Sequence, residues 1–381
     1  MEDLIELAWK ATVASGVLML VVASGQRAGP LLASIAMTYP FNSGVGFSLM
    51  MWQRSDAFMA EAGVAAFALT GGVFAFMTGY VLAASLGGFL RPWLTGIGAW
   101  ALSLPSVCDR ESSYYCIRTV SLSDNPGNPV HLMVVDHLAH GISAREAPRI
   151  MFTEHSAMLD ALPRMRMDRP DFTSFHIGGG TYSVPRAWAD RGISDITIAE
   201  IDPVVTEIAA EQFWFDPARA TILHGDARVA LSRSAQKYDV IVGDAFTDIA
   251  APEHLVTQEF FQLVSQRLSP EGVFAMNLID NLDRLDALAA VVLTLRAVFP
   301  SVEVWTDGRA PQPGERRVFV LLASGSDSPV STIDAMAPDV TRFQALDNAF
   351  INRIVEQKEA QILTDDHAPL AYLIGFDPAL D

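Results

Sequence analysis

The chain has 381 residues, half of them apolar, and a formal net charge of −18 at pH 7. This length allows two or three domains with a full hydrophobic core. The excess of acidic side chains, without any basic cluster, argues against nucleic-acid binding and favours cationic ligands, although acidity by itself also serves solubility.

The charges are distributed unevenly along the chain. Residues 1–107 have a net charge of −1, so the remainder carries the other −17. Ala28–Gln53 and Ala62–Leu90 contain no charged residue, and each exceeds the roughly 20 apolar residues that span a bilayer. Ala11–Gln26 and Leu94–Val107 are shorter apolar stretches. We therefore expect an α-helical membrane domain of three or four transmembrane helices.

Two alternatives explain the apolar region less well. A buried helical core of a soluble protein would rarely contain uncharged stretches of this length. A cleaved signal peptide would end long before the apolar character does. The basic residues Lys10, Arg27, Arg54 and Arg91 are spread too evenly to fix the orientation of the spans.

Residues 108–166 are expected to form a small β-hairpin subdomain and a connecting helix. Ser113–Val120 alternates like an exposed strand, and Val130–Val135 has the composition of a return strand. The turn-forming sequence Asp124–Pro129 lies between them. The helix is expected over about Thr153–Met165.

No metal site is predicted. Cys108 and Cys116 are the only cysteines, and they lack partners in ligand spacing. Two reduced structural thiols are the preferred interpretation, rather than a disulfide framework. His137 and His140 are three residues apart without a supporting carboxylate cluster, so they and His155 are interpreted as structural or acceptor-side residues.

Residues 167–381 alternate between strands and helices, which predicts a parallel, doubly wound, Rossmann-like sheet of the class I methyltransferase type. The strands are expected at about 172–177, 195–201, 220–224, 238–243 and 272–278, and the helices at 184–192, 203–213, 227–234, 257–268 and 282–298. A terminal pair of strands, Val302–Trp305 and Arg317–Ala323, and a last helix near 341–360 complete the domain.

Glycines and acids occur where four of these strands end. Gly178, Gly179 and Gly180 follow the first strand, and Glu200, Asp226 and Asp244 follow the next three. Open α/β sheets bind ligands at this edge. Glu200 is placed to accept hydrogen bonds from ribose hydroxyls, and no later glycine completes a dinucleotide fingerprint. The pattern predicts an enzyme with an adenosyl cofactor.

Each acid also has a simpler interpretation. Asp226 could accept from an adenine amino group or cap the following helix, and capping is preferred for Asp202. Asp244, beside apolar Phe246, could be a base of raised pKa or could hold a cationic substrate. Asp248 could solvate its loop.

These segments resemble the spermidine/spermine synthase family of aminopropyltransferases over roughly Glu111–Val298. The resemblance is carried by Gly178–Gly180, Glu200–Pro203, His224–Asp226 and Tyr238–Asp244, with Glu111–Tyr114 and Val134–Asp136 in the β-subdomain. Chains with membrane spans ahead of such a domain form a transporter-fused subgroup, and Thr364–Pro369 is similar to a C-terminal motif of that subgroup.

The resemblance implies transfer of an aminopropyl group from decarboxylated S-adenosylmethionine to an amine, releasing methylthioadenosine. Glu200 would hold the ribose, Asp226 the adenine, and Asp244 would deprotonate the attacking amine. Two alternatives remain open: a methyltransferase that uses S-adenosylmethionine, and a non-catalytic domain that senses nucleosides.

Departures from the family lie on the acceptor side. An acid that binds the amine is replaced by Thr181, and Asp248 lies four rather than three residues after Asp244. A glutamine expected after the Asp136 segment is His140, and a Tyr-His-Glu motif has become Glu154-His155-Ser156. A diamine acceptor is therefore not favoured.

The predicted partners are a small-molecule amine or other cationic acceptor, the lipid bilayer and a second copy in a homodimer, with no nucleic acid. The predicted location is a multi-pass inner or plasma membrane protein. Its transferase domain is expected in the cytoplasm, where the cofactor is made.

Overall fold

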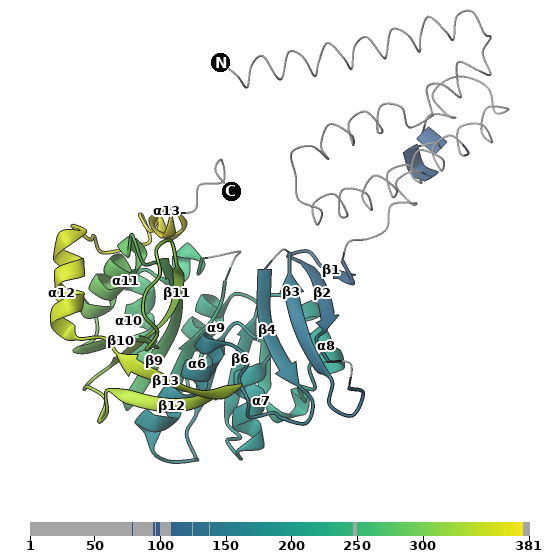
Figure 1. The fold of residues 1–381 in the computed structure, drawn as a ribbon, viewed down its shortest axis with the longest axis horizontal. Coiled ribbons are helices and arrows are strands. Elements are labelled where there is room, and N and C mark those ends of the chain that lie inside the picture. Colours follow the sequence, from purple (N-terminus) through teal and green to yellow (C-terminus); the bar gives the residue numbers. More distant parts are fainter. Residues whose placement is uncertain are drawn as a thin grey trace, which may run out of the picture. The chain divides into compact units, whose positions relative to one another are not determined.

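The computed structural model describes residues 108–375, apart from 124, 137 and 247–249, together with positions 78, 94, 95 and 97–99. The chain divides into two units, Met1–Val107 and Cys108–Asp381, and nearly all described residues belong to the second (Figure 1). Within the described part, every helix is too short or too polar to cross a bilayer. The predicted spans lie outside the described residues, isolated positions excepted.

The second unit begins with an antiparallel sheet of four strands rather than a single hairpin. Its strands are β1 (Arg110–Glu111), β2 (Cys116–Ser121), β3 (Val130–Val135) and β4 (Leu138–Ala144), paired in that order. The prediction for β3 is confirmed. The sequence did not predict β4, because its pairing with β3 is irregular at Met133 and Val134 and its residues do not alternate clearly.

The prediction of two reduced thiols is wrong. Cys108 and Cys116 form a disulfide, with their Cα atoms 5.2 Å apart. A tight turn brings them together: the Ser112 hydroxyl accepts hydrogen bonds from the Tyr114 and Tyr115 amides, and Glu111 lies opposite Cys116 in the β1–β2 pair. The turn therefore brings Cys108 close to Cys116, and their spacing in the sequence alone does not predict this contact.

The main sheet has nine strands among the described residues. They are β5 (Ser174–Ile177), β6 (Ile196–Glu200), β7 (Thr221–His224), β8 (Tyr238–Gly243), β9 (Leu268–Asn281), β10 (Ser301–Asp307), β11 (Arg316–Ser324), β12 (Thr332–Ala337) and β13 (Asp339–Ala345). Their order is β12-β13-β10-β11-β9-β8-β5-β6-β7. Strands β5 to β9 run parallel, as predicted, whereas β10 to β13 pair antiparallel, so the sheet is mixed.

Helices cover both faces of this sheet. They are α6 (Glu154–Met167), α7 (Ser183–Asp190), α8 (Pro203–Gln212), α9 (Ala227–Arg233), α10 (Gln258–Arg267), α11 (Asp286–Arg296), α12 (Asn348–Gln357) and α13 (Leu370–Ile374). One core contains residues of α6, α7 and α8, and the other contains residues of α9, α10 and α11. Alternate residues of a strand point to opposite faces, so Ile241 and Phe274 pack in one core and Val242 and Ala275 in the other. The fold is therefore doubly wound and Rossmann-like.

The last predicted helix is only partly right. Helix α12 covers Asn348–Gln357, whereas the beginning of the predicted segment forms β13. Strand β13 pairs with both β12 and β10, and it buries Phe343 completely. Asp347 then accepts hydrogen bonds from the amides of Ala349 and Phe350, which fixes the start of the helix.

Candidate active site

The site lies at the carboxyl edge of the parallel strands, where the strand order reverses. Strand β5 has β6 on one side and β8 on the other. The Asp244 amide donates to the Ile177 carbonyl (3.0 Å), and the Gly178 amide donates to the Ala199 carbonyl (2.9 Å). These bonds bring the ends of the three strands together, at the position where open α/β sheets bind ligands.

The glycine turn after β5 is constrained by its surroundings. Gly178 has a φ of +88°, and a Cβ there would lie 3.0 Å from the Asp244 carbonyl oxygen. A Cβ on Gly179 would collide with the Tyr182 ring. Tyr182 is fully buried, and its hydroxyl lies 2.6 Å from that of Thr206. Only glycine therefore allows the chain to pass between Asp244 and this ring.

Glu200 braces the same turn. Its buried carboxylate accepts hydrogen bonds from the amides of Gly179 (2.7 Å) and Asp202 (2.9 Å). Burial raises the pKa of Glu200, and these two backbone hydrogen bonds oppose that rise. Asp202 caps α8 by accepting from the Val204 amide, as the sequence favours. The Glu200 carboxylate still borders the cavity described below, where its remaining lone pairs can accept from a ligand.

Asp226 has both a structural and a cavity-lining position. One carboxylate oxygen accepts from the Val229 amide (2.8 Å) and so caps α9. The other lies 2.7 Å from Nε2 of His254. Both Asp226 and His254 line the same cavity as Glu200, so a nucleobase bound in this cavity would contact these two side chains.

Asp244 is half-buried at the end of β8, and its Oδ1 accepts a 2.9 Å hydrogen bond from Nδ2 of Asn277. Partial burial raises the pKa of Asp244, while the nearby His155 and the Asn277 hydrogen bond act to lower it. A carboxylate of raised pKa is a better proton acceptor for an amine than an ordinary aspartate. Asn277 was not predicted as a site residue, although it is a polar residue within the apolar run of β9.

Two adjoining cavities meet at Asp244. The smaller one, about 150 Å³, is bordered by Glu200, Asp226 and His254. The larger one, about 250 Å³, is bordered by His155, His176, Asn277 and Arg316. Residues that line both are Gly178, Gly179, Gly180, His140, Asp244 and Phe246. Asp244 therefore lies between two adjoining cavities.

The other predicted substrate-binding residues, Thr181, Asp136 and Asp248, do not share one position in the structure. Thr181 lines the larger cavity, but it is buried, and its hydroxyl lies 2.7 Å from that of Ser183. Asp136 lies in the β3–β4 turn, accepts from the Cys116 amide (3.0 Å) and lines neither cavity. Asp248 lies outside the described residues. Within the described ranges, no group of three histidine, cysteine or acidic side chains could hold a metal ion.

Comparisons with known proteins agree with this geometry. Residues 176–306 match the family described as "Spermine/spermidine synthase domain". A polyamine aminopropyltransferase of Vibrio vulnificus is 33% identical over 208 residues, which are 51% of this chain and 66% of that protein. An N-terminal histidine N-methyltransferase of Emericella nidulans is 32% identical over 43% of this chain and 30% of that protein. The chain therefore spans less than two thirds of either relative.

A solved structure shows the same fold. The crystal structure of a probable spermidine synthase from Corynebacterium glutamicum superposes with a TM-score of 0.58 at 20% identity. The superposition covers 66% of this chain and 95% of the other. Residues 176–306 thus carry a spermidine synthase domain, and the relatives of the chain include a polyamine aminopropyltransferase.

Proposed function

We propose that the protein moves an aminopropyl group from decarboxylated S-adenosylmethionine to an amine acceptor, with Asp244 as the base. The observation that carries this proposal is the position of Asp244 at the junction of the two cavities, held by Asn277. The smaller cavity would take the nucleoside, with Glu200 at the ribose and Asp226 at the adenine. The larger one would take the acceptor.

The reaction follows from this placement. Asp244 accepts a proton from the acceptor ammonium group, which frees the nitrogen lone pair. That lone pair forms a bond to the aminopropyl carbon attached to the sulfonium. The carbon–sulfur bond breaks, and its electron pair stays on sulfur in methylthioadenosine. Because the leaving group is already activated, the protein contributes mainly orientation and removal of the proton.

Membrane anchoring through residues 1–107 is part of the proposal. It is supported by the two uncharged stretches of the sequence. We also propose an inner or plasma membrane location, with the transferase domain in the cytoplasm beside the source of its cofactor. A homodimer is also part of the proposal.

Product analysis tests the proposed reaction. Purified full-length protein in detergent would receive decarboxylated S-adenosylmethionine and a panel of amines. We expect methylthioadenosine and an aminopropylated amine, with turnover reduced by about 10²- to 10⁴-fold in Asp244→Asn, as loss of a general base typically causes. Nucleoside binding should persist in that variant. An Asp244→Asn enzyme with undiminished turnover would contradict the assignment of the base.

Methyl transfer from S-adenosylmethionine is the second candidate function. It is favoured by Thr181, which stands where the family has an amine-binding acid and is turned toward Ser183 instead. The same preparation given S-adenosylmethionine separates the two reactions, because methyl transfer releases S-adenosylhomocysteine. That product in place of methylthioadenosine would assign the protein to the methyltransferases.

A further inference from the structure

The larger cavity is poorly suited to a diamine. Its described lining contains one acidic residue, Asp244, together with Arg316 and three histidines, His140, His155 and His176. A diamine bound with one nitrogen at Asp244 would bring a second positive charge toward Arg316, which is always protonated. Like charges brought together in this way select against a ligand.

Arg316 is available to a ligand. It lies at the start of β11, opposite Asn281 of β9, and its side chain is exposed. Its side chain forms neither an ion pair nor a hydrogen bond with any residue that the structure describes. Arg316 therefore borders the cavity, and the hydrogen-bond donors of its side chain are unused by the described protein.

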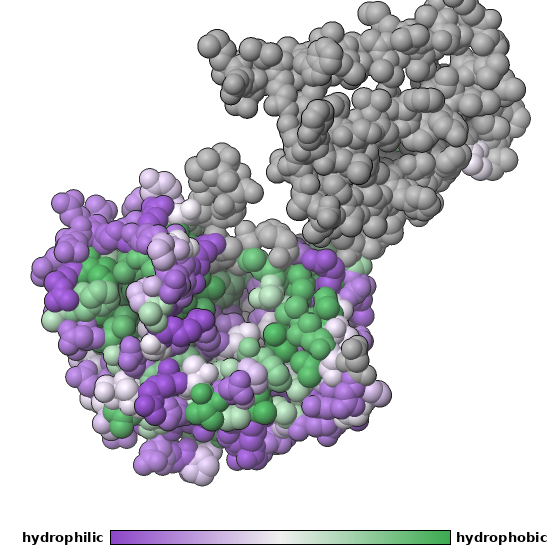
Figure 2. Space-filling view, in the orientation of Figure 1, coloured by the Kyte–Doolittle hydropathy of each residue, from purple (hydrophilic) through white to green (hydrophobic). Residues whose placement is uncertain are grey.

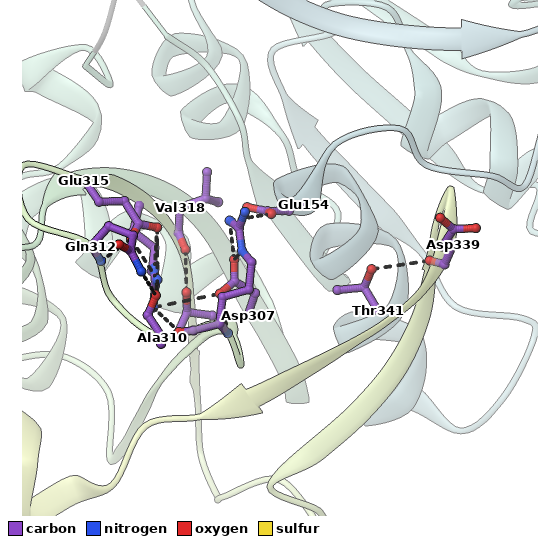
Figure 3. Close-up of polar contacts among 11 residues, drawn as sticks. Glu154, Asp307, Ala310, Gln312, Glu315, Val318, Asp339 and Thr341 are labelled. Atoms are coloured by element: carbon purple, nitrogen blue, oxygen red, sulfur yellow. Dashed lines mark hydrogen bonds and ion pairs between the residues drawn. The ribbon is translucent and has the colours of Figure 1, made fainter.

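Three acids, Glu154 of α6, Asp307 of β10 and Glu315 before β11, form ion pairs with arginines other than Arg316 (Figure 3). Arg309 lies 2.7 Å from a carboxylate oxygen of Glu154 and 2.6 Å from one of Asp307. The buried Arg317 lies 2.9 Å from Glu315. None of these three acids lines the cavity, and each is paired with another arginine, so none of them pairs with Arg316.

Two buried polar atoms at the cavity also lack partners among the described residues: Nε2 of His176 and Oδ1 of Asn277. His176 is only 2% exposed, and burial lowers its pKa to about 3, so the imidazole is neutral at physiological pH. Buried polar atoms are almost always hydrogen-bonded. Their position on the cavity wall indicates a site built for a polar ligand, with Asn277 able to accept from an amine nitrogen.

We propose that the acceptor is an amine that also carries a carboxylate. The amine would lie at Asp244 and Asn277, and the carboxylate would pair with Arg316, whose planar fork of donors matches a carboxylate. This inference rests on the proposed aminopropyl transfer and names its substrate class. It also explains Thr181, because an acid at that position would repel the carboxylate of such an acceptor.

The test compares two probes of equal length, 1,4-diaminobutane and 4-aminobutanoate. Full-length protein with decarboxylated S-adenosylmethionine would be assayed for methylthioadenosine release with each probe. Binding of each probe to the protein loaded with methylthioadenosine would be measured separately by calorimetry. The variants are Arg316→Glu and, as a matched control on the outer surface of α12, Arg353→Glu.

We expect the unsubstituted protein to prefer 4-aminobutanoate in both assays. Arg316→Glu should shift the ratio of kcat/KM values toward the diamine by about tenfold or more, since a rim charge reversal acts mainly on selectivity. Arg353→Glu should leave the ratio unchanged. A wild-type preference for the diamine, unaltered by Arg316→Glu, would overturn the inference while leaving aminopropyl transfer intact. Arg316-dependent binding of 4-aminobutanoate without transfer would support the carboxylate site and reject the proposed reaction.

Discussion

Nδ2 of Asn277 donates a 2.9 Å hydrogen bond to Oδ1 of Asp244, linking the neighbouring parallel strand β9 to the residue that follows β8. Gly243 of β8 pairs with Met276 of β9. The residues that follow them, Asp244 and Asn277, therefore lie side by side. Figure 2 shows that hydrophobic residues are exposed among hydrophilic ones on one face of the second unit, Cys108–Asp381. The Asn277–Asp244 contact makes Asn277 a positioning residue for the proposed base.

Replacing Asn277 should change the pH dependence of catalysis. The base works only when deprotonated, so kcat/KM falls as pH falls through the raised pKa of Asp244. Because the Asn277 hydrogen bond lowers that pKa, Asn277→Leu should move the acidic limb to higher pH. Asn352→Leu, on α12, is the control. Equal loss of activity at every pH, without a shifted limb, would mean a purely structural role.

Asp244 should limit stability as well as support catalysis. Its folded-state pKa is raised above the unfolded value of about 3.9, so the folded state binds more protons. The contribution of Asp244 to the free energy of unfolding therefore falls as pH rises from its pKa in the unfolded state through its pKa in the folded state. Asp244→Asn should therefore melt at a higher temperature than the unsubstituted protein at pH 7, with a difference that shrinks on acidification. A lower melting temperature at pH 7 would contradict this prediction.

Glu200→Gln should weaken nucleoside binding. Both Glu200 oxygens accept a hydrogen bond from a backbone amide, whereas glutamine has one carbonyl oxygen. Glu200→Gln would therefore lose one of these two hydrogen bonds. A hydrogen bond to a charged group contributes about 1.5–3 kcal/mol, which corresponds to about a 10- to 100-fold rise in Kd. Calorimetry with methylthioadenosine measures this. Glu207→Gln, on the exposed face of α8, is the control.

The sequence predicts the parallel half of the sheet well for a physical reason. Strands such as β5 and β6 are buried along their whole length, so each is a short apolar run ended by a glycine or an acid. The β12–β13 hairpin lies at the edge of the sheet and is largely exposed, so its sequence carries a weak strand signal, and the predicted helix overlaps Thr341–Ala345 of β13. Helix propensity was overridden there by pairing with β10.

The site was predictable only where function coincides with strand ends. Gly178–Gly180 and Asp244 follow strands directly and Glu200 is the last residue of β6, so the strand pattern alone locates them. His176 and Arg316 lie within or at the start of strands, and they reach the cavity through sheet pairing between segments far apart in sequence. The disulfide likewise depends on a turn geometry that spacing does not encode.

The disulfide allows a test of location. Disulfides persist mainly in oxidising compartments, whereas the proposal places this domain in the cytoplasm. If Cys108 and Cys116 are paired in the cell, thiol-blocked protein from intact cells adds no alkyl groups before reduction and two after it, a result that would contradict the proposed cytoplasmic location. Cys116→Ala should lower stability by about 2–3 kcal/mol, the chain-entropy value for so short a loop. Full alkylation without reduction would show that Cys108 and Cys116 remain thiols in the cell.

The C-terminal motif should act as a clamp on the nucleoside cavity. Asp365 accepts two hydrogen bonds from Arg228, of 2.7 and 2.6 Å, and one from the Thr257 hydroxyl. Arg228 also donates to the His254 carbonyl, and His254 contacts Asp226. The motif therefore fixes the loop beside the expected adenine position.

Removing this charge should cost stability in a pH-dependent way. The Arg228 hydrogen bonds are the main cause that lowers the pKa of Asp365 to about 2. Their contribution is thus present above the unfolded value of about 3.9 and is lost as pH falls through about 2. The pair is partly exposed, so about 1 kcal/mol, or about 2–4 °C, is expected at pH 7 for Asp365→Asn. Asp366→Asn, at the exposed neighbouring position, is the control. A thermal shift that stays constant from pH 7 to pH 3 would indicate loss of packing rather than loss of the ion pair.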